Sequence, residues 1–482
     1  MSSSLYLEDM LTGIKQYCCI LTVWVGCWAN LVQAQHPTPN RLTLTQAMEL
    51  ARANYPSLRS KLATIRAAEA DQRSVHQSFL PQAGVQAQLL NATSNQVRGA
   101  YVSNGGLLLP ISGVRTDEFS GKAAWTSGTS VVIDWEAITF GRRQARRNQA
   151  QLAIQQAQAD YEGEVFTHQV KVCDAYLLAL NAQKSVALQT VNLERAQALR
   201  TIIRASTEGG LRPGIDSAVA NTEVARARLQ VLESQQMAQQ QVLRLTELVG
   251  QPNPVVELDS LGFYDQLPML ALSPTTGSLH PQLRAFQKGL EVSQANLDGL
   301  RATALPSISL LGSLQGRGSG IGKSPQADGT FSIDPTLGAG LGLRSFNYIV
   351  GVTAIWRPSD LLRTKYALTA QRERINALQQ QYNQQTLALK TADQNATLQL
   401  ELAQLRAQQA PLQLDAARQA YGQAQARYES GLDNILTLTQ ATALLNRAEV
   451  DQALTTNSVW RALLLRAATA GDLDSFLQQL PR

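Results

Sequence analysis

An internal repeat is the feature that most restricts how this chain can fold. Similar residues recur in the same order in its two halves, at nearly constant spacing. The matched pairs are Pro56 and Pro281, Pro81 and Pro306, Trp135 and Trp356, Gly210 and Gly431, and Gly250 and Gly471. The last three pairs share an interval that is four residues shorter than the interval of the first two. We therefore expect two copies of one structural unit with the same internal order.

Each copy predicts the same series of elements. Helices are expected at about 45–78, 142–207 and 216–249 in the first copy, and at about 279–303, 363–429 and 435–470 in the second. Thr43 or Thr45 should cap the first helix, which ends before Pro81. The chain is thus divided into a first repeat (36–250), a Pro-rich linker (251–278), a second repeat (279–471) and a C-terminal tail (472–482).

Helix length and composition predict how these helices pack. The longest ones span roughly 100 Å and the shorter ones roughly 50 Å, so two short helices placed end to end match one long helix. The chain is only 16% charged and 6% aromatic, and its long helices are crowded with Ala and Gln around a narrow apolar stripe. Such helices pack along narrow seams and keep another face in water. A palisade of helical columns around a cylinder is expected.

Alternating apolar and polar residues predict one β-hairpin in each copy, at about 82–135 and 307–356. Long Gly- and Ser-rich connections, 91–120 and 316–345, should join the two strands of each hairpin. The alternation is that of strands with an apolar outer face and a polar inner face.

Aromatic spacing indicates that these strands cross a membrane. Trp125 and Trp135 lie ten residues apart, as do Phe346 and Trp356. Ten residues cover about 33 Å along a strand. A tilt of about 40° reduces this to roughly 25 Å, the height of the apolar band between two aromatic girdles. The four aromatic residues are therefore predicted at the membrane interfaces, in contact with outer-membrane lipids.

Four strands are too few for a closed membrane barrel, which needs about eight. Subunits must therefore pool their strands, and a trimer supplies twelve strands and twelve helical columns. The predicted fold is mainly α with a membrane β-barrel, in which long α-helical hairpins form a tunnel beneath a trimeric twelve-stranded barrel.

Residues 1–35 have the pattern of a signal peptide, with a positive charge before an apolar run and a small-residue cleavage pattern before Gln35. An alternative, lipid attachment at Cys27, stays open. Cys173 would be the only cysteine of the mature chain, so no disulfide is expected.

Several motifs, in this order, resemble those of the TolC-type outer-membrane efflux family. They are LTLTQAMELA at 42–51, NYPSL at 54–58, FLP at 79–81, FGR at 140–142 and RYESGL at 427–432. The resemblance covers nearly the whole mature chain. It implies a homotrimer in the outer membrane of a Gram-negative-type cell, with a barrel continued by a helical tunnel through the periplasm.

The resemblance also implies a function. Such proteins are passive exit ducts for inner-membrane pumps, which they meet through a periplasmic adaptor. Whether the pump belongs to an efflux or a type I secretion system stays open, as does the cargo. The alternative, a structural periplasmic coiled-coil protein without a channel, explains the helices but leaves the strands unexplained.

Site residues follow from the resemblance, position by position. The adaptor-docking tip is expected at Gly210, Leu211, Gly431 and Leu432. The periplasmic gate is expected to involve Arg212, Asp216, Tyr428, Asp433, Thr437 and Gln440. Asp216 should cap the helix after the first turn, and Arg212 is a candidate partner for Asp216 or Asp433. No acidic ring is expected, because Thr437 and Gln440 stand where the family can carry acids.

Other kinds of function find little support. A net charge of +5 without an aromatic-studded basic patch does not favour nucleic acid. The stretch 316–324 resembles a phosphate-binding loop, but Arg317 stands where the first glycine is needed and no helix follows. The four histidines lack ligand spacing and no nucleophile has a base beside it, so we expect no metal, no cofactor and no enzymatic activity.

Four arginines directly follow the strand that contains Trp135: Arg142, Arg143, Arg146 and Arg147. Cations at a helix N-terminus oppose the macrodipole, at a small cost in stability. Anionic lipid head groups would offset that cost. Simple solvation of the arginines is the alternative.

Overall fold

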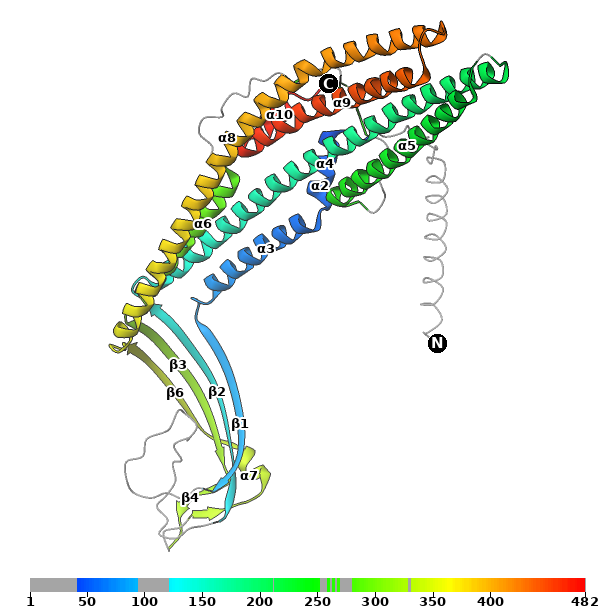
Figure 1. The fold of residues 1–482 in the computed structure, drawn as a ribbon. Helices are drawn as coiled ribbons and strands as arrows, with labels where there is room; N and C mark the ends of the chain where they lie inside the picture. Colours follow the sequence, from blue (N-terminus) through cyan, green and yellow to red (C-terminus); the bar gives the residue numbers. More distant parts are fainter. Residues whose placement is uncertain are drawn as a thin grey trace, which may run out of the picture.

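The computed structural model describes residues 41–93, 121–210, 212–251, 258–260, 262–264, 267–268, 280–327 and 331–481. The predicted signal peptide and the alternative lipid site at Cys27 lie outside the described residues, as does most of the connection 91–120. Long helices and a four-stranded sheet occupy opposite ends of an elongated molecule (Figure 1).

The two halves build the same elements in the same order, which confirms the predicted internal repeat. The first half contains α3 (Pro56–Gln77), β1 (Gln82–Thr93), β2 (Ala123–Ile138), α4 (Arg142–Glu208) and α5 (Gly214–Val249). The second half contains α6 (Pro281–Thr303), β3 (Ser307–Ser319), β6 (Leu343–Ile355), α8 (Asp360–Glu429) and α9 (Ile435–Ala470). A short helix precedes the first series, α2 (Leu44–Asn54), and another follows the second, α10 (Asp474–Leu477).

Each long helix is flanked by two shorter ones, as the helix lengths predict. The helix α4, 67 residues long, packs against α5 and α3, and the 70-residue helix α8 packs against α9 and α6. In Figure 1 the short helices follow one another along the sides of the long ones. The helix α4 also contacts α6 and α9, so it joins the two repeats.

The seam between α8 and α9 is built largely of alanine. Buried positions of α8 recur at alternating steps of four and three residues, with Tyr421 partly buried among them. These positions are Ala396, Leu400, Ala403, Ala407, Ala410, Leu414, Ala417, Ala424 and Tyr428. A repeat of seven residues keeps one narrow stripe against the neighbouring helix and favours left-handed supercoiling. Among the described helices, none has an apolar stretch long enough to cross a membrane.

The prediction of one continuous helix over 45–78 is wrong in one respect, because this segment forms two helices. The helix α2 ends at Asn54 and α3 begins at Pro56. Between them Tyr55 is extended, with φ −67° and ψ 126°, since the proline ring disfavours the helical region for the preceding residue. Thr43 provides the expected cap of α2, in a capping box with Gln46.

The four long strands form one antiparallel sheet in the order β1-β2-β3-β6. Each repeat contributes one hairpin, as predicted, and the pairing of β2 with β3 joins the two hairpins. The predicted connection 316–345 is not all loop. It contains the end of β3, the small hairpin β4 (Ile321–Pro325) and β5 (Phe331–Ile333), and α7 (Leu337–Leu341).

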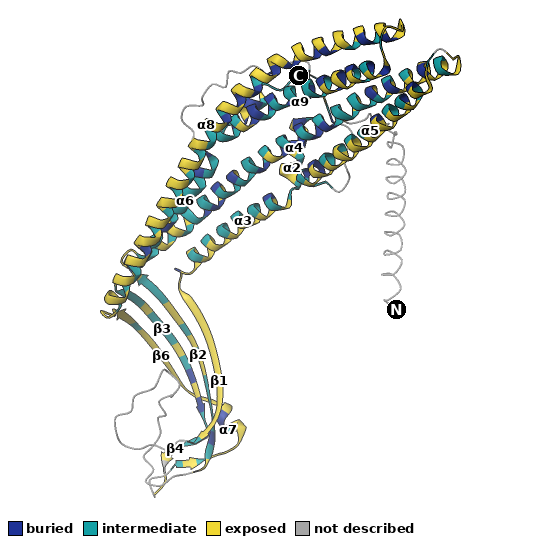
Figure 2. Cartoon of the chain, viewed as in Figure 1, coloured by how far each residue is buried: buried dark blue, intermediate teal, exposed yellow. Residues whose placement is uncertain are grey.

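The register gives the sheet one apolar and one polar face. One row of paired residues across the four strands is apolar and exposed: Val85, Val131, Leu314 and Tyr348. The adjacent row, on the opposite face, is polar: Gln86, Ser130, Gln315 and Asn347. The outer strands β1 and β6 are exposed almost throughout (Figure 2). This is the two-faced pattern that the sequence predicts.

A compact core lies at the level where α2, α4, α9 and α10 meet. Trp460 is 1% exposed, packs edge-on against the rings of Phe263 and Phe476, and donates its indole N–H to the Phe263 carbonyl at 3.0 Å. The Tyr176 hydroxyl lies 2.8 Å from the Leu42 carbonyl oxygen, which draws the start of the described chain onto α4. This core joins both repeats.

We expect Trp460→Ala to lower the free energy of unfolding by about 3–5 kcal/mol, because it removes a fully buried ring and leaves a cavity. Leu454→Ala, on the same helix but 46% exposed, is the matched control and should cost less than about 1 kcal/mol. Denaturant unfolding of the purified full chain measures both. Equal losses for the two variants would contradict the assignment of this core.

Candidate functional site

Two tight turns lie at the end of the molecule farthest from the strands (Figure 1). The first joins α4 to α5 and the second joins α8 to α9. Gly210 and Gly431 adopt left-handed backbone conformations, with φ 71° and 74°, which residues with a Cβ adopt only under strain. Each turn therefore reverses the chain at one glycine in the left-handed region.

The second turn is a Schellman motif that ends in an exposed leucine. The Leu432 N–H donates to the Arg427 carbonyl at 2.9 Å, and the Gly431 N–H donates to the Tyr428 carbonyl at 3.0 Å. This geometry leaves the Leu432 side chain 71% exposed. Its predicted counterpart in the first turn, Leu211, lies outside the described residues.

Asp216 does not cap α5, contrary to the prediction. The residue at the N-cap position is Pro213, α5 begins at Gly214, and Asp216 lies in the first turn of the helix. Its side chain is buried at 8% exposure, and the Tyr428 hydroxyl lies 3.4 Å from its carboxylate. Pro213 is extended, with φ −67° and ψ 146°, which its fixed φ allows, and the Asp216 carboxylate faces Tyr428 of the other hairpin.

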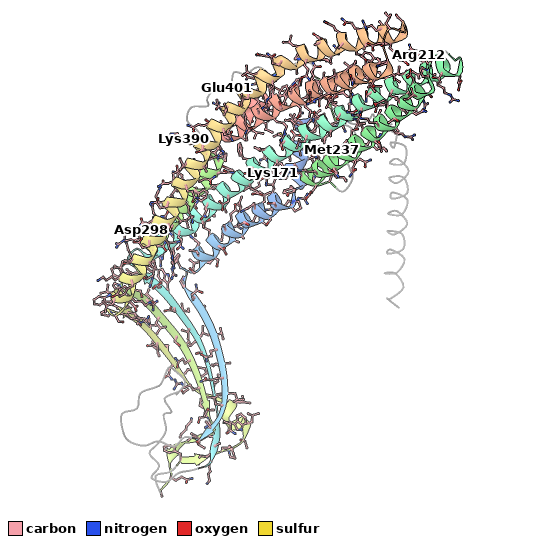
Figure 3. The ribbon with its side chains drawn as sticks, viewed as in Figure 1. Lys171, Arg212, Met237, Asp298, Lys390 and Glu401 are labelled. Carbon is pink, nitrogen blue, oxygen red and sulfur yellow. The ribbon has the colours of Figure 1, made fainter. Side chains whose placement is uncertain are left out.

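Arg212 contacts Tyr428 rather than either predicted aspartate. Its guanidinium donates to the Tyr428 carbonyl oxygen and lies 4.2 Å from the centre of the Tyr428 ring. Figure 3 labels Arg212 at the tip of the helical hairpins. The prediction that Arg212 pairs with Asp216 or Asp433 is therefore wrong.

Tyr428 is the residue that joins the two turns. It is 4% exposed and belongs to a small apolar cluster with members on α4, α5, α8 and α9. Burial raises the pKa of its hydroxyl, the Arg212 charge lowers it, and the Asp216 carboxylate raises it. The hydroxyl therefore stays protonated at neutral pH and can donate to Asp216.

Asp433 organises the start of α9. Its carboxylate accepts hydrogen bonds from the Asn434 N–H at 2.9 Å and the Thr437 hydroxyl at 2.9 Å, and it pairs with Arg427 at 3.3 Å. Asn434 caps the helix by accepting from the Thr437 N–H at 3.0 Å. Thr437 thus belongs to this capping network. Arg427, six residues before Asp433 across the turn, was not assigned a role from the sequence.

Gln440 lies apart from these contacts. It lines a cavity of about 600 Å³ between the two hairpins, together with Arg195, Arg226 and Asn446. Beside this cavity Arg195 of α4 forms a half-buried ion pair with Glu449 of α9. The partners are 254 residues apart, so no local signal in the sequence could have shown this contact.

The predicted interface aromatics lie at both ends of the strands. At the helical end, the Trp135 indole N–H donates to the Phe79 carbonyl at 3.0 Å, and that of Trp356 donates to the Ala304 carbonyl at 3.3 Å. These bonds are equivalent in the two repeats. At the other end, Trp125 packs against the loop that contains α7, and Phe346 is 69% exposed.

Within the described residues, no group of three or more His, Cys, Asp and Glu side chains could hold a metal ion. Two histidines have structural contacts instead. Ring nitrogens of His168 and His280 lie 2.8 and 3.1 Å from the carbonyl oxygens of Leu248 and Ala468, near the ends of α5 and α9. Burial lowers the pKa of both rings.

The family comparison fits this architecture. Residues 47–251 and 275–471 match the family described as outer membrane efflux protein. The chain belongs to this family. Its members are outer-membrane channels for efflux, so this protein is an outer-membrane efflux protein and not an enzyme. The alternative of a coiled-coil protein without a channel is thereby excluded.

Individual relatives agree with the family. The pyoverdine export outer membrane protein OpmQ of Pseudomonas putida is 24% identical over 414 residues, which cover 85% of this chain and 82% of OpmQ. The probable efflux pump outer membrane protein TtgC of the same species is 25% identical over 338 residues, covering 68% of this chain and 66% of TtgC. The outer membrane channel CmeC of Campylobacter jejuni has the same fold, with a TM-score of 0.70 and 16% identity over 89% of this chain and 85% of CmeC.

The second turn of this efflux protein should loosen in acid. Hydrogen bonds from Asn434 and Thr437, and the charge of Arg427, lower the pKa of Asp433. Stabilisation by the ionised carboxylate is therefore complete above its unfolded pKa of about 3.9 and is lost as the pH falls through the lower folded value. Amide hydrogen exchange of Asn434 and Thr437, corrected for intrinsic rates, should show protection lost below about pH 4.

Asp433→Asn should abolish this pH dependence and weaken protection at neutral pH. Asp415→Asn is the matched control, because Asp415 is an exposed acid on α8 that forms only a 3.8 Å pair with Arg418. Protection that falls equally below pH 4 in both variants would assign the effect to another group.

Proposed function

We propose that three copies of this efflux protein assemble into a passive duct that receives cargo from an energised inner-membrane pump through a periplasmic adaptor. The observation that carries this proposal is the two-faced sheet, whose edge strands β1 and β6 have no further neighbour among the described strands. Pairing β1 of one copy with β6 of the next would close a twelve-stranded barrel, with the apolar face towards lipid and the polar face towards water.

The helices support the same assembly. In each copy α4 and α8 form two columns, and the shorter helices stack into two more. Continued around a threefold axis, these columns would enclose a tunnel below the barrel. In this arrangement we place Trp125, Trp135, Phe346 and Trp356 at the membrane interfaces. The division into signal peptide (1–35), repeats (36–250 and 279–471), linker (251–278) and tail (472–482) is part of the same proposal.

We assign two roles to the tip. The exposed turns that contain Gly210, Leu211, Gly431 and Leu432 dock to the adaptor, since they are the most distal part of each hairpin and Leu432 offers apolar surface. The contacts of Arg212 and Asp216 with Tyr428 hold the hairpins together and keep the tunnel mouth closed. Asp433, just before α9, and Thr437 and Gln440 on α9 support the gate.

Arg212→Ala should open the gate. The substitution removes a hydrogen bond and a cation–π contact, together about 1.5–2 kcal/mol, which corresponds to a roughly tenfold shift towards the open state. Planar-bilayer recordings of the purified trimer should show a higher mean conductance. Arg204→Ala is the control, because Arg204 lies on α4 near the tip and pairs only with Glu208 of the same helix. Unchanged conductance in Arg212→Ala would refute the gating role, and absence of any conductance would refute the duct itself.

Leu432→Asp should prevent adaptor docking, because a carboxylate in an apolar contact must be desolvated without a partner. Co-purification of the periplasmic adaptor from cells should fall at least tenfold. The matched control, Leu454→Asp, changes a leucine of α9 that is 46% exposed and lies away from the tip, and it should leave adaptor recovery unchanged. Normal recovery with Leu432→Asp would place the docking surface elsewhere.

A further inference from the structure

A cationic cavity lies between α3 and α4, where these helices approach the strands. Its volume is about 490 Å³. Its lining residues are arginines, a histidine and neutral amides, and none of them is a carboxylate. The ones that matter here are Arg73, His76 and Gln77 of α3, and Gln144, Arg147 and Asn148 of α4.

Arg147 at the cavity and its neighbour Arg143 pack on Phe79, and neither forms an ion pair within the described residues. The guanidinium carbons of Arg143 and Arg147 lie 5.3 and 5.8 Å from the centre of the Phe79 ring. The Nε atoms of both arginines are buried and have no hydrogen-bond partner. A buried donor without a partner is costly. Arg147 lines the cavity, and the terminal nitrogens of its guanidinium can donate to an anion there.

Nearby acids offset only part of this charge. Glu136 forms an ion pair with Arg142, and Glu69 lies 3.8 Å from Arg73 on the exposed surface of α3. The first turn of α4 contains no acid, and Gly141 provides no side-chain cap. The positive end of the helix dipole therefore adds to the charge of the arginines. Consistent with this field, burial and the Arg146 charge both lower the pKa of Arg142.

The second repeat shows that the fold does not need these cations. At the equivalent positions of α8, Thr364, Ala367 and Leu368 replace Arg143, Arg146 and Arg147. Ala304 replaces Phe79.

On α6, the equivalents of Arg73 and His76 are Asp298 and Arg301, which pair with each other at 2.8 Å. Figure 3 labels Asp298 towards the strand end of the helices. The same backbone architecture thus forms there without the arginines that pack on Phe79, although Arg363 and Lys365 stand at the positions of Arg142 and Gln144. The fold therefore does not require Arg143 and Arg147, and their presence in the first repeat points to a role other than folding.

We propose that the cavity between α3 and α4 binds a phosphate group, supplied by the head group of an anionic phospholipid in the adjacent leaflet. Guanidinium groups match phosphate oxygens with paired hydrogen bonds, and the amides of Gln144 and Asn148 can donate further ones. The placement beside a leaflet rests on the proposed function. A free phosphate ion has the same recognition chemistry, and experiment separates the two sources.

Apolar surface beside the cavity favours the lipid. Leu80 lies in the connection from α3 to β1, and Ile138 and Phe140 lie where β2 leads into α4. All three side chains are about half exposed, at 49%, 48% and 50%. They offer a path for acyl chains along the outer face of the strands, while the phosphate stays at the arginines. A soluble phosphate would gain nothing from this surface.

Native mass spectrometry of the purified full-length protein tests the proposal. Short-chain phosphatidylglycerol, phosphatidylcholine and inorganic phosphate are added in separate titrations. The wild type should retain phosphatidylglycerol in preference to phosphatidylcholine. Arg73→Gln/Arg147→Gln should weaken this binding about tenfold or more, as expected for the loss of charge-assisted hydrogen bonds. Arg147→Lys keeps the positive charge but loses the paired N–H donors of the guanidinium, so it should weaken phosphatidylglycerol binding by a smaller factor.

Arg363→Gln is the matched control, because Arg363 lies in the first turn of α8 at the position equivalent to Arg142 and its substitution should leave lipid binding unchanged. If inorganic phosphate binds with the same dependence on Arg147 and phosphatidylglycerol does not, the site is a phosphate site with a soluble source. Equal lipid and phosphate binding by the wild type and the double variant would overturn the proposal. Bilayer conductance, recorded for the same samples, tests the duct separately from the lipid site.

Discussion

The narrow seam of small side chains along each long helix is the constraint on which the rest of this structure depends. Alanines spaced by four and three residues let α8 and α9 approach closely but leave no broad apolar face. A hairpin of this kind cannot enclose a core by itself. It must pack against neighbours on either side, and its polar surface stays in water. The helices therefore form an elongated layer rather than a globular domain.

Contacts between the two repeats therefore occur at intervals along this layer. The core around Trp460 fixes the middle, the ion pair of Arg195 and Glu449 lies nearer the tip, and Tyr428 joins the two turns at the end. The contact around Trp460 is fully buried and mainly apolar, whereas the contacts at the tip combine a small apolar cluster with the polar contacts of Arg212 and Asp216. Under the proposed gating role, the tip rearranges while the middle of the hairpins stays fixed.

The repeat also provides an internal comparison. Both halves use the same elements and equivalent bonds, such as those from Trp135 and Trp356 to the chain before the strand. They differ at the turns and at the junction between strands and helices. The cluster of Arg143 and Arg147 over Phe79 exists in one half only. Because the architecture is the same while these side chains differ, the comparison separates residues that the fold needs from residues that it does not need.

The features that the sequence determined by itself depend on interactions between residues close together in the chain. Periodicity fixed the helices and the two faces of the strands, and glycine at Gly210 and Gly431 fixed the reversals, because each depends on residues close together in the chain. The break between α2 and α3 also has a local cause, the proline that follows Tyr55, although it was not predicted from the sequence. Only the tertiary structure decided the pairing of β2 with β3 and the contact of Arg212 with Tyr428. Their partners are far apart in the sequence and meet only after the hairpins have packed, and that packing sets which side chains face each other.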